Sequence, residues 1–99
     1  MLDYQLSDRA TRDLENVRAW YDRRSVDLGN RLVDDVLLAI RAARERPASF
    51  PEFKRGVRTV QCRSFPYKLY FAMTPKYIDV LAIYHTSRDP ELWDDDERS

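Results

Sequence analysis

The spacing of the apolar residues changes at Pro47, and this change constrains the fold more than any other feature of the chain. Before Pro47, apolar residues recur every three or four positions, which is the period of a helix with one buried face. After Gly56 they follow a period of two, which is typical of strands, and the first six residues also alternate. The sequence therefore predicts an α+β domain in the order strand, helix, helix, strand, strand, strand.

Two helices are predicted between Ser7 and Pro47. Ser7 is placed to cap the first helix, since its hydroxyl can accept an early backbone N–H. One face of that helix holds Ala10, Leu14, Val17 and Tyr21. The apolar stripe of the second helix is expected to hold Leu28, Leu32, Val33, Val36, Leu37, Ile40 and Ala43. Because the link between the helices is short, we expect an antiparallel helical hairpin.

The second half of the chain predicts three strands after a proline-containing loop at 47–53. They span 57–63, 67–73 and 77–85, and the turns between them are short enough for antiparallel hairpins. We expect an antiparallel sheet with the helical hairpin packed on one face. Strict alternation in the last strand separates Tyr77, Asp79, Leu81, Ile83 and His85 from Ile78, Val80, Ala82 and Tyr84. Both faces are thus largely apolar, and the face away from the helices is expected to be an uncovered surface that a partner chain covers.

Length and charge indicate one domain with separated charges. The 99 residues suffice for a single domain, which we place at residues 1–93, followed by an acidic tail at 94–99 that we expect to be frayed. Formal net charge is zero, but residues 54–78 hold six basic and no acidic side chains. Residues 89–97 hold six acidic and no basic ones. The basic strip suits phosphates or an acidic partner.

Several classes of protein are not indicated by the sequence. Apolar runs are far shorter than the roughly 20 residues that span a bilayer, and the amino terminus lacks a signal pattern, so we expect a cytoplasmic protein without a membrane partner. The single cysteine, Cys62, offers neither a disulfide nor a metal site. A glycine-rich phosphate loop and zinc-ligand spacing are also missing, so we predict no cofactor and no metal.

A candidate catalytic set for metal-independent RNA cleavage can be assembled from the strands. Such cleavage needs an acid or base, for which His85 is the candidate, and cations that stabilise the phosphate. The cations would be Arg58, Arg63 and Arg88. The structural alternative for His85 is a strand-end residue hydrogen-bonded to Asp89 or to a backbone carbonyl. An aromatic group that would stack on bases or pack at an interface comprises Phe65, Tyr67, Tyr70, Tyr84 and Trp93.

These residues, taken in order, resemble the RelE/ParE superfamily of bacterial toxins from type II toxin-antitoxin modules. The resemblance rests on the opening strand, Ala10, Asp13-Leu14, Trp20-Tyr21, Pro47, Phe50-Pro51, Val57-Arg58, Phe65-Pro66-Tyr67, Tyr70, His85, Arg88-Asp89-Pro90 and Trp93. The Phe-Pro-Tyr and Arg-Asp-Pro pieces are more similar to the ParE side, the plasmid-stabilisation type. The match covers nearly the whole chain.

The resemblance implies a toxin held inactive by a small antitoxin, whose carboxy-terminal segment wraps it with apolar and acidic side chains. ParE-like members poison DNA gyrase and are not known as catalysts, whereas RelE-like members cut messenger RNA on the ribosome. RelE-like nucleases resemble one another in a dense group of Lys and Arg with a late Tyr or His, and this chain instead ends in Leu92-Trp93 and acidic residues.

We therefore predict a ParE-like, growth-inhibiting toxin that binds gyrase, is not an enzyme and is neutralised by a cognate antitoxin. Residues expected to contact the antitoxin or the target are Arg58, Arg63, Tyr67, Tyr70, Tyr84, Arg88 and Trp93. Two alternatives remain open: a metal-independent, ribosome-dependent mRNA endonuclease built on His85, and a non-toxic binding module of the same fold.

Overall fold

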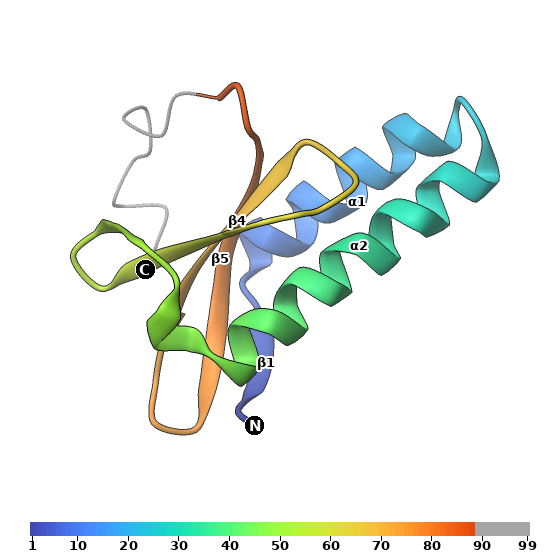
Figure 1. Ribbon diagram of the computed structural model, residues 1–99. Helices are drawn as coiled ribbons and strands as arrows, with labels where there is room; N and C mark the ends of the chain where they lie inside the picture. The colour runs from blue at the N-terminus through green and yellow to red at the C-terminus, as the bar shows by residue number, and fades with distance from the viewer. Residues whose placement is uncertain (89–99) are drawn as a thin grey trace.

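A computed structural model describes residues 1–88 of the chain, in which two α-helices pack against one face of a five-stranded sheet, as the ribbon in Figure 1 shows. The strands are β1 (Asp3–Leu6), β2 (Glu52–Lys54), β3 (Val57–Gln61), β4 (Tyr67–Met73) and β5 (Tyr77–His85). The helices are α1 (Asp8–Asp22), α2 (Val26–Glu45) and a short 3-10 helix, η1 (Pro47–Ser49). The α+β class and the element order are confirmed. The predicted acidic tail and Trp93 lie outside the described residues.

The helical hairpin begins where the sequence predicted. Ser7 Oγ accepts the backbone N–H of Ala10 at 3.0 Å and donates to the carbonyl oxygen of Leu81 at 3.0 Å, so it also ties the start of α1 to β5. The expected stripe of α2 is correct at Leu32, Val36, Ile40 and Ala43, which are buried. Leu37 was wrongly placed in that stripe, since it is 43% exposed. It lies about 100° around the helix from Val36 and therefore faces away from the sheet.

The sheet is mixed rather than wholly antiparallel, with strand order β1-β5-β4-β3-β2. β1 pairs with β5 in parallel, with Tyr4 opposite Ile78, whereas the other neighbouring strands are antiparallel. The expectation of an antiparallel sheet was therefore wrong for its first strand. Only strands joined by short turns must be antiparallel, and β1 is separated from β5 by most of the chain. The loop expected at 47–53 also contributes the start of β2, which pairs with β3.

A bulge in β5 changes which side chains face the helices. Tyr70 pairs with Ala82 and Phe71 with Val80, so Leu81 is an extra residue in β5. Val80 and Ile83 belong to the core beneath the helices, whereas Leu81 and Ala82 belong to a cluster without helical residues. The strict alternation predicted for this strand is therefore wrong beyond Val80.

Two buried clusters lie on the two faces of the sheet. The larger one, between helices and sheet, includes Leu32, Val36, Ile40, Val60, Leu69, Phe71, Ile78, Val80 and Ile83. The smaller one, which we call the second-face cluster, consists of Val57, Tyr70, Leu81, Ala82 and Tyr84, with Phe53 and Ala72 packed against it. Tyr70 and Tyr84 are only 3% and 2% exposed, so the expected uncovered apolar surface is wrong at these positions.

The second-face cluster is buried partly by its own packing. The ring centroids of Phe53 and Tyr70 are 5.0 Å apart, and those of Tyr70 and Tyr84 are 5.4 Å apart. The guanidinium of Arg88 lies 3.9 Å from the centroid of the Tyr84 ring, which is a cation–π contact. These aromatic rings are large enough to shield one another from solvent. The alternation of residues in the sequence indicated an apolar face but not this mutual burial.

Candidate functional site

Arg58 is engaged in holding the loop that precedes β3. Its Nη1 donates to the carbonyl oxygen of Phe50 at 2.6 Å, and its Nη2 lies 3.6 Å from Oε1 of Glu52. The side chain is half-buried on the helix side of the sheet. Arg58 therefore fixes the path of the chain from η1 into β2, and its charge is already partly neutralised by Glu52.

His85 ends β5 and packs edge-to-face on Tyr67, with ring centroids 5.4 Å apart. The backbone N–H of Ser87 donates to His85 Nδ1 at 3.1 Å, and Ser87 Oγ lies 2.8 Å from the same nitrogen. Since Nδ1 accepts the backbone N–H, the neutral ring carries its proton on Nε2. His85 thus orders the turn after β5, but through the N–H and hydroxyl of Ser87 and not through the backbone carbonyl that was one of the two expected partners. Asp89, the partner considered from the sequence, lies outside the described residues.

Tyr67 belongs to an aromatic chain that joins α1 to the turn between β3 and β4. Tyr21 meets Trp20, Phe65 and Tyr67 in edge-to-face contacts at centroid distances of 4.8, 5.0 and 6.3 Å. Burial, with a smaller contribution from Tyr21, raises the pKa of Tyr67 to about 12. Tyr67 therefore stays protonated at neutral pH, and its contacts indicate a packing role.

Arg88 and Tyr84 meet two α1 residues, Arg9 and Asp13, that were not predicted as site residues. The guanidinium of Arg9 lies 5.1 Å from the Tyr84 ring centroid, while Asp13 Oδ2 accepts the N–H of Ile83 at 3.0 Å. Asp13 thus provides the hydrogen-bond acceptor for the Ile83 N–H of β5, beyond the point where the neighbouring strand β1 ends. Burial raises the pKa of Asp13, although the Ile83 hydrogen bond and then the nearby arginines lower it. A cleft of about 330 Å³ beside them is lined by Arg9, Arg12, Asp13 and Asn16.

A larger groove of about 450 Å³ lies between α2 and β3. Its apolar lining consists of Leu38, Ala39, Ala42, Phe50 and Val60, and its polar lining of Asp35, Arg41, Glu45, Arg46, Gln61 and Arg63. Of the predicted contact residues that the structure describes, Arg63 is the one that lies here. We call this feature the α2–β3 groove.

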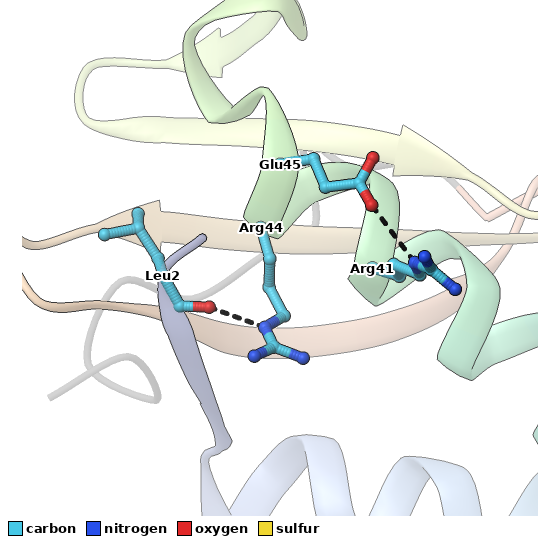
Figure 2. Close-up of polar contacts among 4 residues, drawn as sticks. All are labelled: Leu2, Arg41, Arg44 and Glu45. Carbon is cyan, nitrogen blue, oxygen red and sulfur yellow. Dashed lines mark hydrogen bonds and ion pairs between the residues drawn. The ribbon is translucent and has the colours of Figure 1, made fainter.

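The arginines near the end of α2 have different roles. Figure 2 shows Arg41 Nε donating to Glu45 Oε1 at 3.0 Å, while Arg44 Nε donates to the carbonyl oxygen of Leu2 at 2.6 Å. Arg44 thereby ties α2 to the chain just before β1. By contrast, neither Arg46 nor Arg63 makes an ion pair within residues 1–88. The groove therefore has two cations that its own described residues do not neutralise.

Asp35 closes one end of the groove and was missed from the sequence. It is 5% exposed, and its Oδ2 accepts the backbone N–H groups of Ser64 and Phe65, each at 2.9 Å. The signal was available, since an acidic residue lies between Leu32 and Val36 on the buried face of the helix. Asp35 holds the turn that follows Arg63 against α2, and so fixes the mouth of the groove.

Cys62, the single cysteine of the chain, is buried. Burial, and secondarily the charge of Asp35, raises the pKa of Cys62 to about 12, so this thiol is not a ready nucleophile. No group of three or more His, Cys, Asp or Glu side chains in that part of the chain is arranged to hold a metal ion. None of the helices within residues 1–88 is long and apolar enough to cross a membrane.

Comparison with known proteins gives a family from the sequence and a shared fold from a solved structure. The family model described as the ParE toxin of the type II toxin-antitoxin system parDE matches residues 4–90. A solved structure titled as the chromosomal ParDE toxin-antitoxin system from P. aeruginosa shares the fold, with a TM-score of 0.74 and 20% identity over 86% of this chain and 96% of that chain. No curated protein matches the sequence. Because the family model covers nearly the whole chain, the chain belongs to the ParE toxin family of type II toxin-antitoxin systems.

Proposed function

We propose that this ParE-family toxin inhibits growth by binding DNA gyrase, without catalysing a reaction, and that a cognate antitoxin neutralises it. The observation that carries the proposal is the family-model match over residues 4–90. A cytoplasmic location follows from a gyrase target, and a role in plasmid stabilisation belongs to the same proposal. The P. aeruginosa structure, titled as a ParDE system, supports an antitoxin as the partner.

The placement of the nuclease candidates supports binding over RNA cleavage. His85 and Tyr84 are consecutive in β5, so their side chains point to opposite faces of the sheet, and Arg88 lies over Tyr84. Arg58 is bonded to the Phe50 carbonyl on the helix side. Metal-independent cleavage needs its acid, base and cations around one phosphate. His85, Arg58 and Arg88 instead contact different partners, namely Tyr67, the Phe50 carbonyl and Tyr84, which favours binding over cleavage.

Among the residues expected to contact the antitoxin or the target, we retain Arg63 and Arg88 because their side chains are exposed. Tyr70 and Tyr84 are buried and Arg58 holds a loop, so these three are assigned to the fold. Tyr67 is half-buried, and its ring makes an edge-to-face contact with His85. We assign it to packing.

Parallel assays with the purified chain test the target. With gyrase and supercoiled DNA, we expect trapped cleavage complexes, seen as linear DNA after detergent and protease treatment. With translating ribosomes, we expect no cuts in messenger RNA. Ribosome-dependent cuts without any effect on gyrase would overturn the proposal in favour of the endonuclease. Unchanged growth on induction without antitoxin would instead favour a non-toxic binding module.

A further inference from the structure

The solvent side of α1 carries a row of hydrogen-bond donors and positive charge. Arg12 and Arg23 are separated by about three helical turns, and Arg23, the C-cap, keeps the helical conformation, so both side chains leave the helix on the same side. Asn16 and Ala19 lie between them on that side, and all four residues are exposed. We call these four residues the α1 stripe. Neither of its arginines makes an ion pair within residues 1–88.

The carboxylates of α1 lie beside the α1 stripe and not on it. At 100° per residue, Asp13 lies about 90° around the helix on one flank, whereas Glu15 and Asp22 lie about 70–90° around it on the other. Asp8 precedes the stripe by one turn. Asp13 turns inward to accept a backbone N–H of β5, and Asp22 faces Arg18, whose Nε lies 3.7 Å from its Oδ2. The α1 stripe therefore presents positive charge to an approaching partner.

Arg88 adds a third exposed guanidinium beside the amino-terminal end of the α1 stripe. It lies 3.9 Å from the centroid of the Tyr84 ring and makes no ion pair with the described part of the chain. Burial raises the pKa of Asp13, whereas its backbone hydrogen bond and three nearby guanidiniums lower it, namely those of Arg9, Arg88 and Arg12. Arg12 and Arg88 thus lie near the same carboxylate, next to the cleft of about 330 Å³ described above.

The chemistry of the α1 stripe fits a phosphate backbone better than a protein surface. Protein interfaces are centred on buried aromatic or apolar anchors, and the stripe has none. The nearest aromatic ring, that of Trp20, has the guanidinium of Arg24 3.3 Å from its centroid, so one face is already covered. Guanidinium and amide groups are the donors that proteins direct at DNA phosphates. Ala19, with its small side chain, lets a backbone approach the helix.

The length of the α1 stripe matches several phosphates of one DNA strand. From Arg12 to Arg23 the helix rises about 16 Å, at 1.5 Å per residue. Phosphates follow one another every 3.4 Å along the axis of one strand, so the row passes about five of them. The two arginines can therefore bind different phosphates of the same strand, with Asn16 between them.

We propose that the α1 stripe, together with Arg88, binds the phosphate backbone of duplex DNA. This binding rests on the proposed function only in taking the duplex to be the DNA that gyrase holds. Contacts with phosphates carry no sequence information, so the chain would bind wherever gyrase has engaged a duplex. The toxin of the trapped complex would then contact the DNA as well as the enzyme.

The salt dependence of DNA binding tests the number of phosphate contacts. Anisotropy of a short fluorescent duplex is measured with the purified full chain at increasing salt. Three contacts give a slope of about −2.7 in log affinity against log salt, which is a loss of about 40-fold between about 50 and 200 mM. In the double variant Arg12→Gln/Arg23→Gln the slope should be about −0.9 and the loss about threefold. Both side chains are exposed, so circular dichroism should show an unchanged fold.

A second double variant, Arg55→Gln/Lys76→Gln, removes the same charge from two exposed turns away from α1. It should bind the duplex within about twofold of the unmodified chain, with an unchanged salt slope. Equal weakening of both double variants would show that overall charge attracts the DNA, and would overturn the role of the α1 stripe. Absence of duplex binding by the unmodified chain at the lowest salt would also overturn it.

Two competing ligands and the gyrase assay complete the test. Tighter binding of single-stranded RNA than of the duplex, or binding of polyglutamate where the duplex does not bind, would overturn the assignment to duplex DNA. If the unmodified chain traps gyrase complexes but does not bind the duplex, the assignment of the α1 stripe fails and the proposed function stands. If it binds the duplex as expected but traps no gyrase complexes, the proposed function fails and the DNA-binding stripe stands.

Discussion

Replacing Asp35 with alanine should destabilise the chain more than any other change of a polar residue described above. The carboxylate is 5% exposed and accepts two backbone N–H groups at 2.9 Å. Hydrogen bonds to charged groups contribute about 1.5–3 kcal/mol each. The amide of exposed Ser64 can regain a water when the carboxylate is removed, whereas that of half-buried Phe65 regains one less readily. We therefore expect a loss near the lower end of the summed range, about 3 kcal/mol.

Urea unfolding monitored by circular dichroism measures this loss directly. For a domain of this size, about 3 kcal/mol corresponds to a fall in Tm of about 12–24 °C. Asp35→Asn keeps an oxygen that accepts both N–H groups but loses the charge, so its loss should be about 1 kcal/mol. The matched control is Asp34→Ala at the neighbouring, exposed position, which should change stability by no more than about 0.5 kcal/mol. If Asp35→Ala and Asp34→Ala have equal free energies of unfolding, the role assigned to Asp35 is wrong.

Three further predictions concern α1, the loop before β3 and the end of β5. Burial raises the pKa of Asp13 above its ordinary value of 3.8, so the folded chain binds this proton more tightly than the unfolded chain. The contribution of Asp13 to the free energy of unfolding should therefore fall as pH rises from 3.8 through the raised pKa. Asp13→Asn should remove that fall in urea unfolding measured across this pH range. Arg58→Ala breaks the bond to the Phe50 carbonyl and should cost about 1–2 kcal/mol in the same measurement, with no loss of gyrase inhibition by the folded fraction. If gyrase inhibition falls by more than the fraction of folded protein does, Arg58 contacts the target directly and its assignment to the fold is wrong. His85→Ala should leave growth inhibition unchanged in a plating assay. If this variant is fully folded but no longer inhibits growth, the endonuclease hypothesis based on His85 is favoured again.

The class of fold could be predicted because helical and strand periods are local properties of the sequence. The bounds of β4 and β5 and the cap at Ser7 followed from turn residues and alternation. The parallel pairing of β1 could not be predicted, because no short turn joins it to a partner. The bulge at Leu81 was missed for a related reason. An extra residue is accommodated by the opposing strand, and nothing in the sequence of β5 marks it.

The candidate site was less predictable than the fold. Arg58 and Arg63 look alike in the sequence, yet Arg58 bonds to a loop carbonyl, whereas Arg63 lies at a groove and makes no ion pair with residues 1–88. Which role an arginine takes depends on what a distant segment places beside it. The groove itself arises from the packing of α2 beside β3, and neither element has a motif that predicts it. Asp35 was the one part of it with a sequence signal, as an acidic residue on an apolar face.

Titration of trapped gyrase complexes against the antitoxin tests the central claim most directly. Purified chain is added to gyrase and supercoiled DNA until linear DNA is released, and the antitoxin encoded by the same module is then added stepwise. We predict that linear DNA rises with the toxin and disappears when the antitoxin reaches an equimolar amount. If the chain, shown to be folded and to inhibit growth, produces no trapped complexes at any concentration, gyrase is not its target and the proposed function is wrong.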